Sequence, residues 1–305
     1  MIATTRSFEL PLPGLREDNP RDFLAALGLL RLVDKLWPEC CTRLRWCPDT
    51  ITPELRGDKP LPDNWAATLV AALLDLVQLP GKPMAHGEII KTSYESFRAA
   101  TQRAVEFART DHPLANIPLL LYSCYASQIP SENGDIEPSG FSFGNAQSGK
   151  KLLLDATQLI ERLDVEELLA TLQGKAEGVA AKTLRWNPTE YRPAAYRSHD
   201  PGSKHKGDGT LDFPALNVLA FFGMTFYPVV ATATGATTAG MFRLGRQSFF
   251  LWPAWSTPLS VEEIASLLVS DLTTQGSEVG VDRVWRSRRF SSDKSLYFAP
   301  AEIHR

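Results

Sequence analysis

The segment from Gly144 to Lys151, with the sequence GNAQSGKK, comes closest to a known phosphate-binding motif. It matches the first seven positions of a P-loop and lies between a strand-like run, FSF, and a helical pattern. A P-loop next requires a Ser or Thr that holds Mg²⁺, but Lys151 stands there, so the sequence disfavours nucleotide hydrolysis. Lys150 and Lys151 at a glycine-rich helix start can still bind an anion, such as a nucleic-acid phosphate. The alternative is a tight turn with two solvated lysines.

A second group of candidate residues lies between Lys182 and Lys206, where cationic and aromatic side chains are interleaved. Arginines neutralise phosphates and flat rings stack on bases, so this composition is typical of a surface that binds nucleic acid. The alternative is that the rings pack the loop onto the core, while Glu190, Asp200 and Asp208 neutralise part of the charge. The residues that we single out are Arg185, Trp186, Arg192, Tyr196 and Arg197.

The third group is the run VWRSRRF, which places Arg286, Arg288 and Arg289 beside Trp285 and Phe290. We expect a strand here, in which Arg286 and Arg288 share one face and Arg289 takes the other. Arginines in this arrangement can clamp phosphates or the acidic surface of a partner protein. Solvated arginines on an edge strand are the alternative.

The histidines and cysteines form no metal-binding or catalytic motif. The five histidines are scattered. His199-Asp200 is the one His-Asp dipeptide, and it supplies too few ligands for a metal phosphohydrolase. The four cysteines contain no CxxC pair, which favours free thiols over a zinc site or a disulfide framework. We therefore expect no cofactor and no enzymatic activity, with a degenerate nucleotide-binding site at Gly144–Lys151 as the remaining enzymatic hypothesis.

The composition indicates a folded protein whose contacts with nucleic acid would be local. Of the 305 residues, 44% are hydrophobic and 22% are charged, which is far from the composition of disordered chains. The net charge of −3 excludes a globally basic DNA-binding protein, so such contacts require a local patch. The N-terminus lacks the apolar core of a secretory signal, and polar residues or prolines interrupt the longer apolar stretches. We expect a cytoplasmic protein without a membrane span.

The order of the expected helices and strands, which must position these residues, predicts an α+β fold with antiparallel strands. We expect one compact unit over residues 1–305. Helices and strands do not alternate in a regular βαβ rhythm, which disfavours a doubly wound sheet. A helical section is expected at about 60–128 and a polar basic-aromatic loop at about 182–210. The expected helices are Asp22–Trp37, Trp65–Leu79, Tyr94–Phe107, Leu152–Leu172, Phe213–Met224 and Val261–Leu272. The expected strands are Ser7–Leu12, Arg43–Trp46, Phe226–Thr234, Thr238–Leu244, Ser248–Leu251, Val281–Phe290 and Leu296–Phe298.

Two local signals refine this picture. Asp18 or Asn19, followed by Pro20, is expected to cap the first long helix. The small residues of that helix, including Gly28, allow a neighbouring element to approach closely. The stretch Ile129–Gly140, rich in Pro, Ser, Asn, Gly and acidic residues, is expected to be a mobile loop.

Several longer stretches resemble a family of proteins from CRISPR-Cas loci of type I-G, formerly called I-U. They are LPGLREDNPRDFLAALGLLRLVDKL near the start, RWNPTEYRPAAYR in the middle, and PALNVLAFFGMTFYPVV and FFLWPAWSTPLSVEEIASLL towards the end. The resemblance implies an accessory or large-subunit-like protein of an RNA-guided complex, in which guide pairing reads the sequence and protein subunits hold the nucleic-acid backbone. It also implies contact with other effector subunits or with the helicase-nuclease.

The residues and the resemblance together favour a non-catalytic subunit of an RNA-guided antiviral interference complex. Such a subunit would contact target DNA or guide RNA and partner subunits. One alternative is a protein–protein adaptor that recruits the helicase-nuclease without touching nucleic acid. The other is a degenerate P-loop protein that binds a nucleotide.

Overall fold

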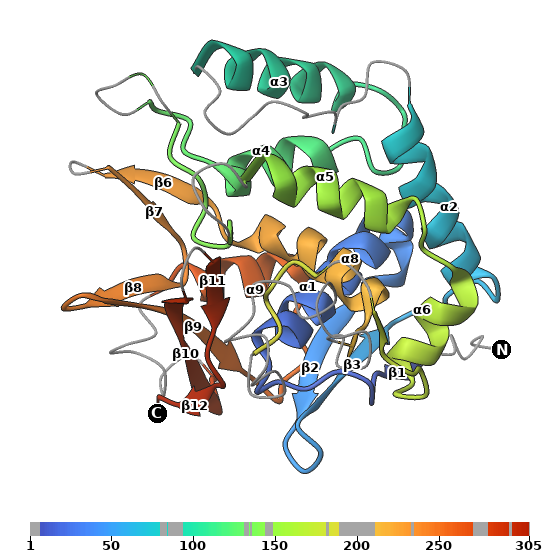
Figure 1. Cartoon of the computed structure of the whole chain (residues 1–305). Helices are drawn as coiled ribbons and strands as arrows, with labels where there is room; N and C mark the ends of the chain where they lie inside the picture. Colours follow the sequence, from blue (N-terminus) through green and yellow to red (C-terminus); the bar gives the residue numbers. More distant parts are fainter. Residues whose placement is uncertain are drawn as a thin grey trace, which may run out of the picture.

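The computed structural model places two buried helices between a layer of helices and the two larger antiparallel sheets (Figure 1). The structure describes residues 7–79, 84, 94–130, 134, 136–143, 149–180, 183–188, 211–232, 235–270, 280–292 and 295–304. The helices are α1 (Pro20–Leu36), α2 (Trp65–Gln78), α3 (Tyr94–Phe107), α4 (Ile117–Tyr125), α5 (Gly149–Ile160), α6 (Val165–Leu172), α8 (Pro214–Gly223) and α9 (Val261–Leu268), with the short 3-10 helices η1 (Pro38–Cys40) and η3 (Met224–Phe226).

The strands pair in antiparallel fashion throughout the described residues. The N-terminal sheet has the order β1-β3-β2, and the C-terminal sheet has the order β11-β10-β9-β8, with β12 also paired to β10. This arrangement confirms the expected α+β class. The strands are β1 (Phe8–Pro11), β2 (Arg43–Cys47), β3 (Thr52–Gly57), β4 (Val179–Ala180), β5 (Leu211–Asp212), β6 (Val229–Thr232), β7 (Gly235–Thr238), β8 (Met241–Leu244), β9 (Gln247–Ala254), β10 (Arg283–Ser292), β11 (Ser295–Phe298) and β12 (Glu302–Ile303).

Helix α1 begins where the sequence indicates. The side chain of Asn19 accepts hydrogen bonds from the backbone N–H groups of Arg21 (3.0 Å) and Asp22 (3.4 Å), and Pro20 occupies the first turn. The residues from Pro20 to Val33 are buried, so this helix lies inside the molecule rather than on its surface. Of the two expected caps, Asp18 and Asn19, the structure shows Asn19.

Helices α1 and α8 touch through their backbones. A Cβ atom added to Gly28 of α1 would overlap the carbonyl oxygen of Leu219, and one added to Gly223 of α8 would overlap the carbonyl oxygen of Leu24. Only glycine allows this approach, because any side chain would fill the space that the other backbone occupies. The expectation of close packing at Gly28 is thus confirmed.

A cluster of large aromatic residues connects α1 to both sheets. Phe23 of α1 stacks on Trp46 of β2, with 5.6 Å between ring centroids, and meets Trp255 edge-on at 6.2 Å. The backbone N–H of Trp46 donates to the carbonyl oxygen of Trp255 (2.8 Å), so the free edge of β2 pairs with the chain that leaves β9. Aromatic pairs of this kind bury large areas, and they join the sheets to one core.

The remaining helices cover the other side of α1 and α8. In Figure 1, α3 is outermost, α4 and α5 lie beneath it, and α8 and α1 come next. Contacts between neighbouring elements follow the same order, with α3 on α4, α5 on α8, and α8 on α1. Helices α2 and α6 pack together and close one side of this layer. None of the described helices is both long and apolar enough to cross a membrane.

Several local expectations differ from the structure. Helix α4 was not among the expected helices, and the expected strand Thr238–Leu244 is interrupted between β7 and β8. The FSF run at 141–143 is not a strand. The region expected as one helix, Leu152–Leu172, contains two helices, α5 and α6. The side chain of Asp164 caps α6 by accepting hydrogen bonds from the backbone N–H groups of Glu166 (2.8 Å) and Glu167 (3.0 Å). Strand β3 was not expected, because Pro53 and Gly57 interrupt its strand-like composition. Strand β10 lies between β9 and β11, so the edge-strand alternative for its arginines is wrong.

The stretch Ile129–Gly140 is only partly described, and its last residues are ordered by strand-like pairing. The backbone N–H of Ser127 donates to the carbonyl oxygen of Glu137 (2.8 Å), and that of Ser139 donates to the carbonyl oxygen of Tyr125 (2.8 Å). The carboxylate of Glu137 also accepts a hydrogen bond from the backbone N–H of Ala236 in β7 (2.7 Å). The described residues 136–140 are therefore tied to the β6–β7 hairpin.

Candidate nucleic-acid interface

Described members of the second and third groups of candidate residues, Trp186 and Arg289, meet at one short segment, Phe141 to Phe143. The indole N–H of Trp186 donates to the carbonyl oxygen of Phe141 (2.9 Å), and Arg289 of β10 donates to the carbonyl oxygen of Ser142 (3.4 Å). The segment Gly144–Lys151 follows directly, although residues 144–148 and the side chains of Lys150 and Lys151 lie outside the described part. The structure therefore joins the described members of groups that the sequence analysis treated separately.

Aromatic packing fixes the segment Phe141 to Phe143 on the C-terminal sheet. The ring of Phe141 meets Phe250 of β9 edge-on at a centroid distance of 5.0 Å, and Phe143 meets Phe298 of β11 at 4.6 Å. Both phenylalanines are buried. Burying their apolar area holds the intervening carbonyl groups at the rim of the sheet, where Trp186 and Arg289 reach them.

Trp186 is a structural residue and does not offer a surface for stacking. Its side chain is 0% exposed, and its ring lies edge-on to Phe141 at 6.1 Å. The prediction that its ring stacks on bases is therefore wrong, and the alternative, that it packs the loop onto the core, describes it. The sequence could not separate the two, because an aromatic ring serves both purposes equally well.

Arg185, next to Trp186, lies over the ring of Tyr297 in β11. Its guanidinium carbon is 5.7 Å from the centroid of the Tyr297 ring, and its backbone has a positive φ of 65°. Few non-glycine residues adopt this left-handed conformation, which here turns the chain so that Trp186 enters the core while Arg185 stays half-buried. Of the other members of the second group, Arg192, Tyr196 and Arg197 lie outside the described residues.

The arginines of β10 divide between two faces, as expected. Arg286 and Arg288 lie on the outer face, where their guanidinium carbons are 5.7 Å from the ring of Phe249 and 5.9 Å from the ring of Phe290. Arg286 also forms an ion pair with Glu302 of β12 (2.8 Å). Arg288 is exposed and has no carboxylate partner among the residues described here. On the outer face of β10, Glu302 thus neutralises Arg286, whereas Arg288 is exposed to an external ligand.

Arg289, on the opposite face, is a half-buried cation without a carboxylate. Its guanidinium carbon is 5.4 Å from the ring of Phe143, and its Nε atom is buried without a hydrogen-bond partner in the part of the chain that is described. Burial lowers the pKa of Arg289, and the nearby charge of Arg243 lowers it further. The side chain stays protonated at any ordinary pH, so an anion placed here would offset the cost of burying its charge.

Arg243 is a candidate residue that the sequence analysis missed. It pairs in register with Ser248, which in turn pairs with Arg289, and it is exposed. The signal was present in the sequence, because Gly245 and Arg246 form a two-residue turn between two expected strands and thereby set this register. A search for runs of basic residues does not find Arg243, because it stands alone in the sequence and comes near Arg289 only through the pairing of the strands.

A polar cluster, buried in large part, connects the start of α1 with Asn187 and with the segment from Asp212 to Asn217. Arg21 forms ion pairs with Asp22 (2.7 Å) and with the fully buried Asp212, and Asp212 accepts a hydrogen bond from Asn217 (2.9 Å). The amide of Asn19 donates to that of Asn187 (3.1 Å). These bonds satisfy charges that would be costly to bury alone, and they fix the positions of residues 187 and 212 on the start of α1.

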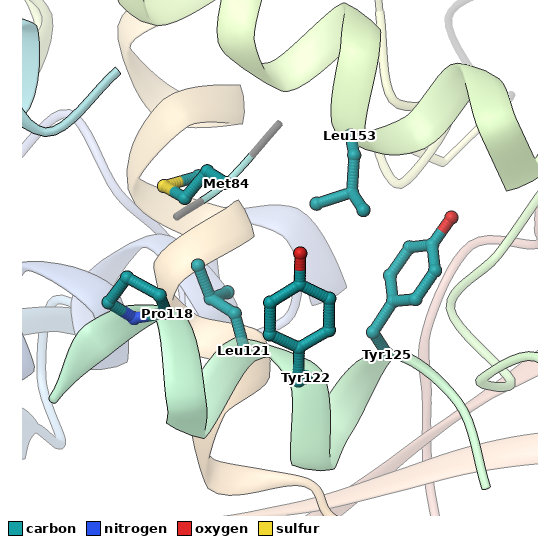
Figure 2. Close-up of a pocket in the computed structure, with 6 residues that line it drawn as sticks. All are labelled: Met84, Pro118, Leu121, Tyr122, Tyr125 and Leu153. Carbon is teal, nitrogen blue, oxygen red and sulfur yellow. The ribbon is translucent and has the colours of Figure 1, made fainter. Parts of the chain in front are cut away.

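The described residues can be compared with the requirements of a metal site and of a ligand pocket. They contain no group of three or more His, Cys, Asp or Glu side chains that could hold a metal ion. A pocket between α4 and α5 is lined by apolar side chains and two tyrosines (Figure 2), and its interior of about 10 Å³ is the room that one water molecule needs. Its lining residues are Met84, Pro118, Leu121, Tyr122, Tyr125 and Leu153.

Comparisons of the chain with protein-family models, with curated proteins and with solved structures find no match. The fold and the site define an α+β protein whose C-terminal sheet carries arginines at its rim and on its outer face.

Proposed function

We propose that this chain is a non-catalytic subunit of an RNA-guided antiviral interference complex of CRISPR type I, in which it contacts target DNA or guide RNA and partner subunits. The complex works in the cytoplasm. The proposal is supported by the resemblance of four sequence stretches to a type I-G family and by the arginines of the C-terminal sheet. It assigns binding, and no bond-making step, to this chain.

The observation that carries the proposal is the set of arginines without carboxylate partners around one rim of the sheet. Arg243, Arg288 and Arg289 form no ion pair with any described residue, and they lie on the paired strands β8, β9 and β10 of one sheet or beside them. Arg98 and Arg103 of α3 also form no ion pair there, but they are not part of this group. An unpaired cationic cluster on a protein with a net charge of −3 is a local feature that matches a polyanion. Aromatic rings beneath the arginines hold their stems in place.

The binding of labelled single-stranded, duplex and R-loop DNA by the double variant Arg288→Gln/Arg289→Gln tests this proposal. We expect its affinity at low salt to fall about tenfold or more relative to the wild-type chain, since two charged contacts are lost. The matched control is Arg98→Gln/Arg103→Gln, which removes the same charge from exposed positions of α3. A melting temperature close to that of the wild type would show that each variant is folded.

Two results would refute nucleic-acid contact through these arginines. One is a wild-type chain that binds none of the nucleic acids at low salt, both alone and with the other subunits of its complex. The other is an equal loss of affinity in the α3 control. Should nucleic acid not bind while partner subunits still do after nuclease treatment, the chain is an adaptor instead.

A further inference from the structure

A row of three polar side chains crosses the C-terminal sheet at the rim of its core face. The register pairs Arg243 of β8 with Ser248 of β9, and Ser248 with Arg289 of β10. Directly paired residues of antiparallel strands point to the same side, so all three side chains share one face with Ser248 in the middle. Because neighbouring strands are about 4.8 Å apart, the backbones of the two arginines are about 10 Å apart.

The two arginines share this face of the sheet, and neither has a carboxylate partner among the described residues. Neither forms an ion pair there, and the charge of Arg243 contributes to lowering the pKa of Arg289. Arg289 has a buried Nε–H group without an acceptor among the described residues. Arg243 is exposed, and Ser248 is half-buried. Two like charges across one serine are unfavourable unless a negative group lies between them.

We propose that Arg243, Ser248 and Arg289 bind one phosphate group of a nucleic-acid backbone. The guanidinium groups present N–H donors from two sides and the serine hydroxyl adds a third donor, which suits a tetrahedral oxyanion. The row ends at the exposed β8–β9 turn, from Leu244 to Gln247, so a polymer can pass over it. This inference rests on the proposed function and names the group that is recognised.

The first measurement is the binding of inorganic phosphate. Its readout is the rise in the melting temperature of the protein as phosphate is added at constant ionic strength. The second is the affinity for a fluorescent single-stranded oligonucleotide. We expect Arg243→Gln to weaken both by about tenfold, since it removes charge-assisted hydrogen bonds. Ser248→Ala, which leaves every charge in place, should weaken both by a smaller factor. The control Arg246→Gln removes an exposed charge from the same turn and should leave phosphate binding unchanged.

A double-mutant cycle tests whether the two arginines hold the same group. If they do, Arg243→Gln should have little further effect in a chain that already carries Arg289→Gln, because neighbours that share a ligand are not additive. Full additivity would overturn the shared site, and so would equal phosphate binding by the wild type and Arg243→Gln.

The outcome for nucleic acid separates this inference from the proposed function. If Arg243→Gln loses phosphate binding but keeps full affinity for the oligonucleotide, the row does not hold the backbone and the inference is wrong. If only Arg288→Gln/Arg289→Gln loses affinity for DNA, the proposed function stands and the inference falls. Equal losses in Arg243→Gln and Arg246→Gln would indicate unspecific attraction and would also overturn the inference.

Discussion

At the scale of single residues, burial decides what a charged or aromatic side chain can do. Trp186 is buried and holds a loop, although its neighbours in the sequence suggest a base-stacking role. Arg21 is buried between Asp22 and Asp212, so its charge stabilises the interior, while the exposed Arg288 is available to a ligand. The residue type does not distinguish these two arginines. Their burial and their carboxylate partners do.

The substitution Arg21→Met should destabilise the protein by about 3–5 kcal/mol, because it leaves buried carboxylates without their cation. Urea denaturation would measure the free energy of unfolding. The control Arg43→Met breaks a largely exposed ion pair with Asp58 (3.1 Å) and should cost at most about 1 kcal/mol. An equally mild effect of both substitutions would contradict a stabilising role for the buried cluster.

The same variant should show a distinct dependence on pH. Burial raises the pKa of Asp22, although Arg21 opposes the rise, and without Arg21 that opposition is lost. A carboxyl group with a raised pKa in the folded state favours folding below its unfolded pKa of about 3.9, and this contribution is lost as the pH rises through the folded pKa. The stability deficit of Arg21→Met relative to the wild type should therefore shrink between pH 8 and pH 5.

At the scale of elements, the crossing of α1 and α8 sets the geometry of the core. Gly28 and Gly223 let the two helix backbones meet, and α8 leads through η3 into the strands of the C-terminal half. Both helices are almost wholly buried, so their positions depend on this contact rather than on solvent-facing polarity. The sequence indicated the small residues, but not which partner helix they contact.

The substitution Gly28→Ala should destabilise the protein by about 2 kcal/mol, as seen by urea denaturation. Alanine favours a helix over glycine by about 1 kcal/mol, but an overpacked core costs up to about 3 kcal/mol, and here the obstacle is the backbone of Leu219. Ser266→Ala, at an exposed position of α9, should change stability by less than about 0.5 kcal/mol. A stabilised Gly28→Ala variant would show that α1 and α8 do not touch at this point.

At the scale of the whole molecule, charge is distributed so that binding would be local and moderate. The net charge is −3, and Arg243, Arg288 and Arg289 have no carboxylate partners in the described part of the chain. Counterion release from duplex DNA scales with the number of phosphates that are neutralised. If the chain is a subunit of a nucleic-acid-binding complex, as proposed above, it should bind strongly only when that complex supplies further contacts.

The salt dependence of duplex binding tests this distribution of charge. With Arg243 and Arg289 on one phosphate and Arg288 on a second, two neutralised phosphates predict a slope of about −1.8 for log K against log salt concentration, which is about a 12-fold loss of affinity between 50 and 200 mM salt. A slope near zero would contradict electrostatic contact. A slope of about −3.6 would indicate that Lys150 and Lys151 also neutralise phosphates. Fluorescence anisotropy over a range of salt concentrations gives the slope directly.

The sequence by itself determined the elements that depend on local signals. The Asn19-Pro20 start of α1, the bounds of α2 and α3, and the strand that carries Arg286 and Arg288 follow from capping residues and apolar spacing, which act over a few residues. Only the tertiary structure decided the site. Phe141 meets a residue 45 positions away and Ser142 one that is 147 positions away. Such contacts arise when the whole core is packed, and no local pattern encodes them.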